Sequence, residues 1–142
     1  MEDSLRIAED KYRTLVEKIP PIVYITGPTQ HIGVTYISPR VEAIGFGQEE
    51  WMADPELWLR QVHPEDQRRV LAEIEKSIED QKPFSSEYRI RTRDGQVKWF
   101  LDEVVDIFGD DGNLQYRQGY MLDITARKLA EESLSVRERY LE

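Results

Sequence analysis

Cysteine is absent from this chain of 142 residues. Its absence excludes disulfides, thiol catalysis and zinc sites built on cysteine. Basic residues are scarce as well, because 19 lysines and arginines face 28 acidic residues and leave a net charge of −9. A surface this acidic is repelled by phosphate backbones. We therefore expect no nucleic-acid partner.

Long apolar runs are missing too. No run approaches the ~20 residues that a membrane-spanning helix needs, and no secretory leader precedes the first charged residues. We expect no membrane contact in this segment and a cytoplasmic location. The composition that is present, 39% hydrophobic and 33% charged residues, is typical of a single globular domain.

Proline positions and hydrophobic spacing predict the elements of the first half. Apolar residues three and four apart form a helical pattern that Pro20-Pro21 ends. Ser38-Pro39, Asp54-Pro55 and His63-Pro64 each place a capping side chain before a proline, which is typical of a helix start. The predicted elements are a helix over 1–18, strands at 22–26 and 34–37, and helices near 39–45, 48–53, 55–61 and 64–81.

The second half changes to alternation with period two after Pro83. Asp94-Gly95 and Asp111-Gly112 are strong hairpin signals and predict three antiparallel strands. Thr125 can then cap a final helix over 126–142. Five strands in two blocks around a helical insert form one sheet of an α+β domain.

Three stretches carry a likeness to a known family: Tyr36–Phe46 (YISPRVEAIGF), Trp58–Asp66 (WLRQVHPED), and Glu87–Arg91 (EYRIR) followed by Asp94-Gly95, Trp99 and Asp123-Ile124-Thr125. Their order and spacing resemble the PAS domain, a sensory module of bacterial signalling proteins. The last stretch is similar to the C-terminal, PAC-type motif of that family. The likeness covers about residues 12–128.

The resemblance implies a five-stranded antiparallel sheet with helices over one face, enclosing a small pocket. It divides the chain into an N-terminal flanking helix (1–18), a sensor domain (19–125) and a coiled-coil-like linker helix (126–142). It also implies that the terminal helices pass a signal along the chain. In the subgroup with the His-Pro-acid-Asp stretch, parent proteins are commonly histidine kinases or cyclic-dinucleotide enzymes (diguanylate cyclases or phosphodiesterases).

The end of the last strand holds the candidate relay residues Asp123, Ile124 and Thr125. Thr125 can cap the helix, and Asp123 can pair with a base such as Arg127, Lys128 or an arginine of the strand at 87–93. Such a junction could couple distortion of the sheet to the helix. An ordinary capped turn is the alternative, and the two roles are compatible.

Pocket candidates are large apolar residues of the helical insert and the sheet. They are Val41, Ile44, Trp51, Leu57, Val70, Ile74, Tyr88 and Trp99. A simply filled core explains the same residues, since bulky aromatics fill space.

Cofactor chemistry is constrained by the same absence of cysteine. We identify no cofactor, and we expect a covalent flavin or a thiol-linked chromophore to be excluded, while a noncovalent small ligand stays open. His63 could bind heme or a metal, but its place before a proline favours a helix cap, and His31 lies in a predicted turn. We expect no metal site and no nucleophile motif.

Both terminal helices carry apolar stripes, which predict a homodimer because a monomer would expose them. The stripe residues are Leu5, Tyr12, Leu15, Leu129, Val136 and Tyr140. The two ends also resemble each other, with Glu-Asp-Ser-Leu near the start and Glu-Glu-Ser-Leu near the end. This similarity favours a tandem array in which 142 residues are part of a longer protein.

The leading hypothesis is a regulatory sensor without catalysis of its own, which transmits a change to an output domain outside this chain. One alternative is a stand-alone enzyme acting on a small ligand. For that role we find no acid in an apolar run that would raise its pKa, and the polar strand face explains Glu87 and Glu103. A ligand-free dimerisation spacer is a further alternative.

Overall fold

One five-stranded antiparallel sheet, with strand order β2-β1-β5-β4-β3, organises the chain. The computed structural model describes residues 2–27 and 33–141. The helices are α1 (Glu2–Lys18), α2 (Gln48–Ala53), α3 (Leu57–Gln61), α4 (Pro64–Asp80) and α5 (Thr125–Leu141), with a 3-10 helix η1 (Pro39–Ile44). The strands are β1 (Ile22–Thr26), β2 (Val34–Ile37), β3 (Phe84–Arg91), β4 (Val97–Phe108) and β5 (Leu114–Asp123).

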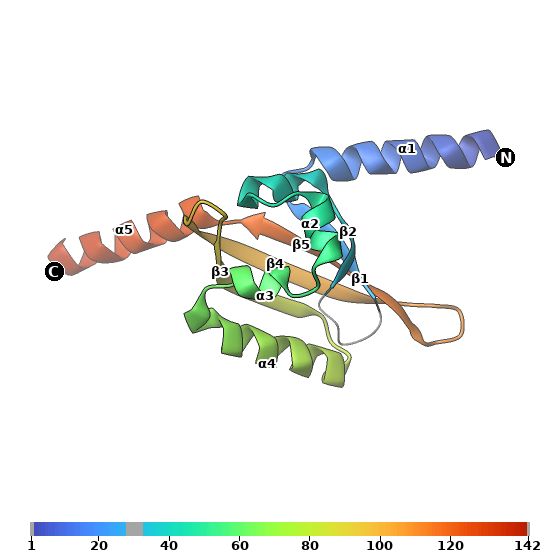
Figure 1. The fold of residues 1–142 in the computed structure, drawn as a ribbon. Helices are drawn as coiled ribbons and strands as arrows, with labels where there is room; N and C mark the ends of the chain where they lie inside the picture. Colours follow the sequence, from blue (N-terminus) through green and yellow to red (C-terminus); the bar gives the residue numbers. More distant parts are fainter. Residues whose placement is uncertain (1, 28–32, 142) are drawn as a thin grey trace.

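The predicted fold class is confirmed: α2, α3 and α4 lie over one face of the sheet, while α1 and α5 project from it at the two ends of the chain (Figure 1). We call the face beneath α2–α4 the inner face and the opposite one the outer face. The division into a flanking helix (1–18), a sensor domain (19–125) and a linker helix (126–142) stays a prediction.

The capping chemistry differs among the three predicted helix starts. His63 caps α4 as expected, because its Nδ1 accepts a hydrogen bond of 3.2 Å from the Glu65 amide. Ser38 does not cap η1; its hydroxyl accepts from the amide of Val23 at 2.9 Å and ties the insert to β1. Asp54 accepts from the amide of Glu56, and α3 begins only at Leu57.

The hydrophobic core lies on the inner face. It joins strand residues such as Tyr24, Tyr88 and Phe100 to Trp51 and Val70 of the helices. Along β4 the buried set is Phe100, Asp102 and Val104; along β5 it is Arg117, Gly119 and Met121.

Gly119 is required at its position by close packing. A Cβ there would lie 2.6 Å from the Tyr24 ring and 2.9 Å from a carbonyl oxygen of β4. The absent side chain therefore lets the ring and hydroxyl of Tyr24 lie close to the backbone of β5.

The terminal helices leave apolar side chains uncovered. Leu5 and Leu15 of α1 are 63% and 66% exposed, and Leu129 of α5 is 61% exposed. Tyr12 and Val136 are exposed as well, whereas the side chain of Tyr140 lies outside the described part. Within residues 2–27 and 33–141, no helix combines the length and the apolar character needed to cross a membrane.

Candidate functional site

A cavity of about 70 Å³ lies between the inner face and the helices. Its walls are mostly apolar, with Trp51 of α2, Trp58 of α3 and Ile74 of α4 on the helical side. Tyr24, Asp102 and Arg117 form a polar end on the sheet. The cavity therefore has the character of a small-molecule site, in which a few polar groups orient a ligand among apolar walls.

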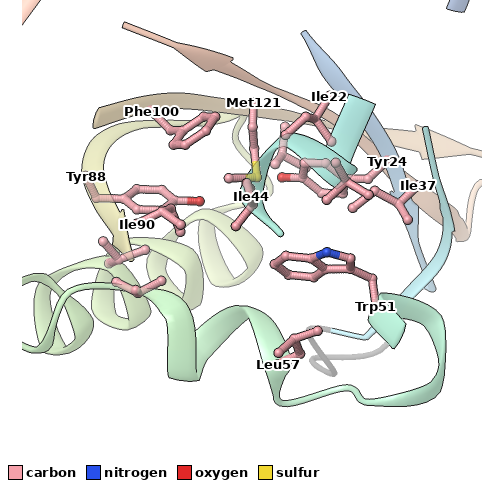
Figure 2. Close-up of a cluster of buried hydrophobic side chains, with 14 of the residues drawn as sticks. Ile22, Tyr24, Ile37, Ile44, Trp51, Leu57, Tyr88, Ile90, Phe100 and Met121 are labelled. Carbon is pink, nitrogen blue, oxygen red and sulfur yellow. The ribbon is translucent and has the colours of Figure 1, made fainter. Parts of the chain in front are cut away.

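Asp102 is the central polar group of this pocket. The Tyr24 hydroxyl donates to its Oδ1 and the Tyr88 hydroxyl to its Oδ2, each at 2.5 Å. Figure 2 shows the two tyrosine hydroxyls turned toward each other from opposite sides of the core. Trp58 Nε1 donates to the Tyr88 oxygen at 2.9 Å, which leaves the Tyr88 proton for Asp102. Three elements of the sheet thus meet at one carboxyl group.

Burial sets the electrostatics of this cluster. It raises the pKa of Asp102 to about 6, although the two tyrosine hydrogen bonds and Arg117 act in the opposite direction. Burial also raises the pKa of Tyr24 and of Tyr88 well above the usual value, and the charge of Asp102 adds to the effect. Both phenols therefore stay protonated donors, while Asp102 titrates near neutral pH.

Arg117 is the buried base beside this carboxyl group. Its Nε donates to Asp106 Oδ1 at 2.6 Å and its Nη2 to Ser77 Oγ at 2.8 Å, which fastens β5 to β4 and to α4. The Ser77 hydroxyl in turn donates to the carbonyl of Lys82 at 2.6 Å. One guanidinium thus bonds to the carboxyl group of Asp106, and its charge also acts on the carboxyl group of Asp102.

Two of the eight predicted pocket residues, Trp51 and Ile74, line the cavity. Five others pack in or around the core without lining it: Val41, Ile44, Leu57, Val70 and Tyr88. Trp99 needs a correction, because it lies on the outer face, half-buried beside α5, and does not reach the pocket.

Sequence reasoning missed the polar end of the pocket, and the statement that no acid lies in an apolar run with a raised pKa is wrong. Asp102 lies within Trp99-Phe100-Leu101-Asp102-Glu103-Val104, in phase with Phe100 and Val104. This alternation could have revealed that Asp102 is buried, since residues two apart on a strand share a face.

A second candidate site is the junction of β5 and α5. The amide of Thr125 donates to Asp123 Oδ1 at 2.9 Å, and the amide of Trp99 donates to Thr125 Oγ1 at 3.0 Å. The amide of Ile124 donates to the Trp99 carbonyl at 2.9 Å. The three relay candidates therefore attach the start of α5 to β4.

Glu87 of β3, rather than Asp123, receives the bases of α5. Lys128 Nζ lies 2.6 Å from Glu87 Oε1, and Arg127 Nη2 lies 2.5 Å from Oε2. The hydrogen bond from Lys128, and then that from Arg127, holds the pKa of Glu87 below its usual value. The expected pairing of Asp123 with a base is replaced by its bond to Thr125.

Trp99 lies between the junction and the helical insert. Lys128 Nζ is 4.7 Å from the centroid of the Trp99 ring, and the Arg89 guanidinium carbon is 5.4 Å from it. Arg89 also forms a bidentate pair with Asp66 at the start of α4, at 2.8 and 3.0 Å. This pair lowers the pKa of Asp66 through the side-chain bonds of Arg89. A continuous set of contacts thus connects α4, β3, β4 and α5.

The histidine candidates offer no such arrangement. His63 Nδ1 is occupied as the cap of α4. His31 lies outside the described residues. Across the part of the chain that the structure describes, no group of three or more His, Cys, Asp or Glu residues is arranged to hold a metal ion.

Comparison with known proteins gives a consistent result. A family model described as the PAS fold matches residues 34–121. The N-terminal domain of a diguanylate cyclase with a PAS/PAC sensor from Marinobacter aquaeolei is 31% identical, with a TM-score of 0.69, over 76% of this chain and 98% of that one. A sensory box histidine kinase/response regulator from Burkholderia thailandensis E264 is 26% identical, with a TM-score of 0.70, over 92% and 97%.

Among curated proteins, a methyl sulfide methyltransferase-associated sensor from Methanosarcina acetivorans is 27% identical over 135 residues. The match covers 94% of this chain and 14% of that protein. The chain therefore has the length of one small part of this relative.

The exclusion of a covalent flavin needs a correction. The fold is shared with an RNA-binding light-oxygen-voltage receptor, at 16% identity and a TM-score of 0.73. It is also shared with a light-oxygen-voltage domain whose mechanism was examined with a flavin analogue, at 15% identity and a TM-score of 0.68. Flavin chemistry therefore occurs with this fold, and the exclusion of a covalent flavin, which was drawn from the missing cysteine, is not supported.

Proposed function

This chain belongs to the PAS fold family and is a sensor domain similar to those of a diguanylate cyclase and a histidine kinase, and we propose that it passes a change induced by a ligand or a partner through α5 to an output domain. The PAS fold is a sensory, non-catalytic one, so the proposal assigns no reaction to this chain.

The observation that carries the proposal is the attachment of α5 to the sheet. Thr125 Oγ1 accepts from the amide of Trp99 on β4, and Lys128 reaches both Glu87 on β3 and the Trp99 ring. A shift between β3 and β4 would alter these contacts together and so change the orientation or fraying of the first turn of α5. The proposed relay is therefore Asp123, Ile124 and Thr125, extended by Glu87 and Lys128.

The class of output domain is part of the proposal. The diguanylate cyclase and the histidine kinase whose sensor regions match this chain support those two classes. A two-component kinase or a cyclic-dinucleotide enzyme is therefore the output we propose for this chain.

We also propose a homodimer formed through the flanking helices. The support is the exposure of Leu5, Tyr12 and Leu15 along α1 and of Leu129 and Val136 along α5. A shallow groove adds to it, because Tyr12 and Val16 of α1 face Val23 and Tyr36 across a hollow on the outer face. A second copy would cover these apolar surfaces, and α5 would continue as a coiled-coil linker.

A chimera tests the relay. The chain is joined through α5, in several linker lengths, to the kinase core of a characterised dimeric histidine kinase, and autophosphorylation is measured. We expect Glu87→Gln and Thr125→Val to change the rate by about fivefold or more, the usual scale of coupling between sites. Both remove a bond between the sheet and α5 and leave the pocket intact.

Glu132→Gln on the exposed side of α5 is the matched control, and it should leave the rate unchanged. If Glu87→Gln and Thr125→Val behave like wild type at every linker length, the relay through α5 is ruled out.

A further inference from the structure

The buried charges around the pocket do not balance. The buried guanidinium of Arg117 forms an ion pair with Asp106, whereas Asp102 accepts hydrogen bonds from the neutral hydroxyls of Tyr24 and Tyr88. Asp54, at the edge of the same cavity, is already paired with Arg60. When Asp102 is ionised, the polar end of the pocket therefore carries one uncompensated negative charge away from bulk water.

From this imbalance we propose that the pocket takes a small organic cation with an apolar, preferably aromatic body, such as a protonated aromatic amine. The amine would donate to Asp102, and the body would lie among the apolar walls near Trp51, Trp58 and Ile74. This inference rests on the sensory role proposed above and names the class of ligand for it.

The hydrogen bonds of Asp102 leave room for such a donor. Each carboxylate oxygen accepts one tyrosine hydroxyl and keeps a further acceptor site. The Tyr88 hydroxyl is directed at the carboxylate, because its own oxygen accepts from Trp58. The cluster therefore presents acceptors to the cavity, which suits a ligand with N–H groups.

An anionic ligand is disfavoured by the position of Arg117. Its Nε is held by Asp106 and its Nη2 by Ser77, so two of its three nitrogens already bond within the protein. An anion would also face the charge of Asp102. The pocket thus differs from an anion site, where an arginine offers its paired N–H groups to the ligand.

Three probes of one shape and different charge test the proposal on the whole chain: benzylamine, benzyl alcohol and benzoate. Binding is followed at pH 7.5 through the indole N–H resonances of Trp51 and Trp58, with Trp99 on the outer face as internal control. We expect benzylamine to bind about tenfold more tightly than benzyl alcohol, and benzoate more weakly than either. Equal affinities, a preference for benzoate, or shifts that appear at Trp99 instead would overturn the proposal.

Two further measurements assign the preference to Asp102. Asp102→Asn should reduce the advantage of benzylamine to less than about threefold, whereas Asp110→Asn, an exposed acid that does not line the cavity, should retain it. If Asp102→Asn does not fold, wild type at pH 5 replaces it, because Asp102 is then protonated while benzylamine remains cationic.

The groups that face Asp102 in that pH test are Tyr24, Tyr88, Arg117 and Glu103. The two tyrosines keep their protons between pH 5 and 7.5, because their pKa values are raised well above the usual value. Unchanged preference at pH 5 and in Asp102→Asn would refute the role of this residue. Failure here leaves the relay untouched, because the chimera experiment changes only junction residues and contains none of these probes.

Discussion

The two faces of the sheet have an unusual distribution of polarity. The inner face is enclosed, yet it holds buried Asp102 and Arg117, the latter paired with Asp106. The outer face is open, yet it carries apolar side chains such as Val105, 46% exposed, and half-buried Leu101. Burial and polarity are thus partly reversed relative to an ordinary two-layer domain.

This reversal separates two tasks. Buried polar groups are costly unless their partners are arranged in advance, so a charged cluster inside the domain is suited to respond to a ligand or to protonation. An exposed apolar face is suited to a protein surface that covers it. The contacts of Glu87, Trp99 and Lys128 lie on the outer side, where α5 begins.

The strongest test of the comparison is the removal of the buried base. Arg117→Met leaves the carboxylate of Asp106 buried without its partner, and we expect the free energy of unfolding to fall by about 3 kcal/mol or more. Arg60→Met is the matched control, because its pair with Asp54 is exposed to solvent and should contribute far less to stability. Urea denaturation measures the free energy of unfolding of both variants. Similar losses would show that the buried cluster stabilises the protein no more than the exposed ion pair does.

The next test concerns the apolar surfaces outside the core. Leu15→Glu and Leu129→Glu place a charge on the proposed dimer stripes, and we expect the dimer dissociation constant to rise about tenfold or more in each. Ala72→Glu on the exposed side of α4 is the control and should leave it unchanged. Sedimentation equilibrium measures the constants, and a wild-type chain that stays monomeric at high concentration would contradict the dimer.

A third test uses pH to separate the two faces. The pKa of Asp102 is raised to about 6 in the folded protein, so the folded state binds its proton more tightly than the unfolded state does. The resulting stability is complete below the unfolded pKa of about 4 and is lost as the pH rises through about 6. We expect the free energy of unfolding to increase by about 1 kcal/mol from pH 7.5 to pH 5.

Glu87 and Asp66 act in the opposite direction, because their pKa values are lowered. Their contribution is lost only as the pH falls through these lowered values, below the window of Asp102. Asp102→Asn should therefore flatten the rise between pH 7.5 and 5, while Glu87→Gln should retain it. A variant Asp102→Asn that keeps the full rise would assign the effect to another group.

The sequence predicted the element order well because local chemistry determines it. His63-Pro64 marked the start of α4, and the Asp-Gly turns marked the hairpins. It predicted the faces of β4 and β5 less well. Asp102 and Arg117 occupy inner positions on these strands and interrupt the apolar alternation there. Aromatic residues of the outer face, such as Trp99, were therefore assigned to the core.

The sequence predicted the local contacts of the proposed relay and missed its long-range contact. Thr125 and Asp123 form a local turn, which a capping pattern can indicate. The partner of Lys128 is Glu87, which lies 41 residues earlier in the chain and on β3, two strands across the sheet from β5. Such a pairing depends on sheet register, which no local pattern encodes.

The smallest predicted effect lies at this junction and depends on where it is measured. Lys128→Met removes a partly exposed ion pair and a cation–aromatic contact, which together contribute about 1 kcal/mol or less to global stability. Because α5 has few other contacts with the sheet, we expect hydrogen exchange to accelerate in its first turn more than in β3 or α4. Lys76→Met on α4 is the control and should change neither region. If hydrogen exchange rises equally throughout the domain, Lys128 stabilises the fold as a whole and does not specifically attach α5 to the sheet.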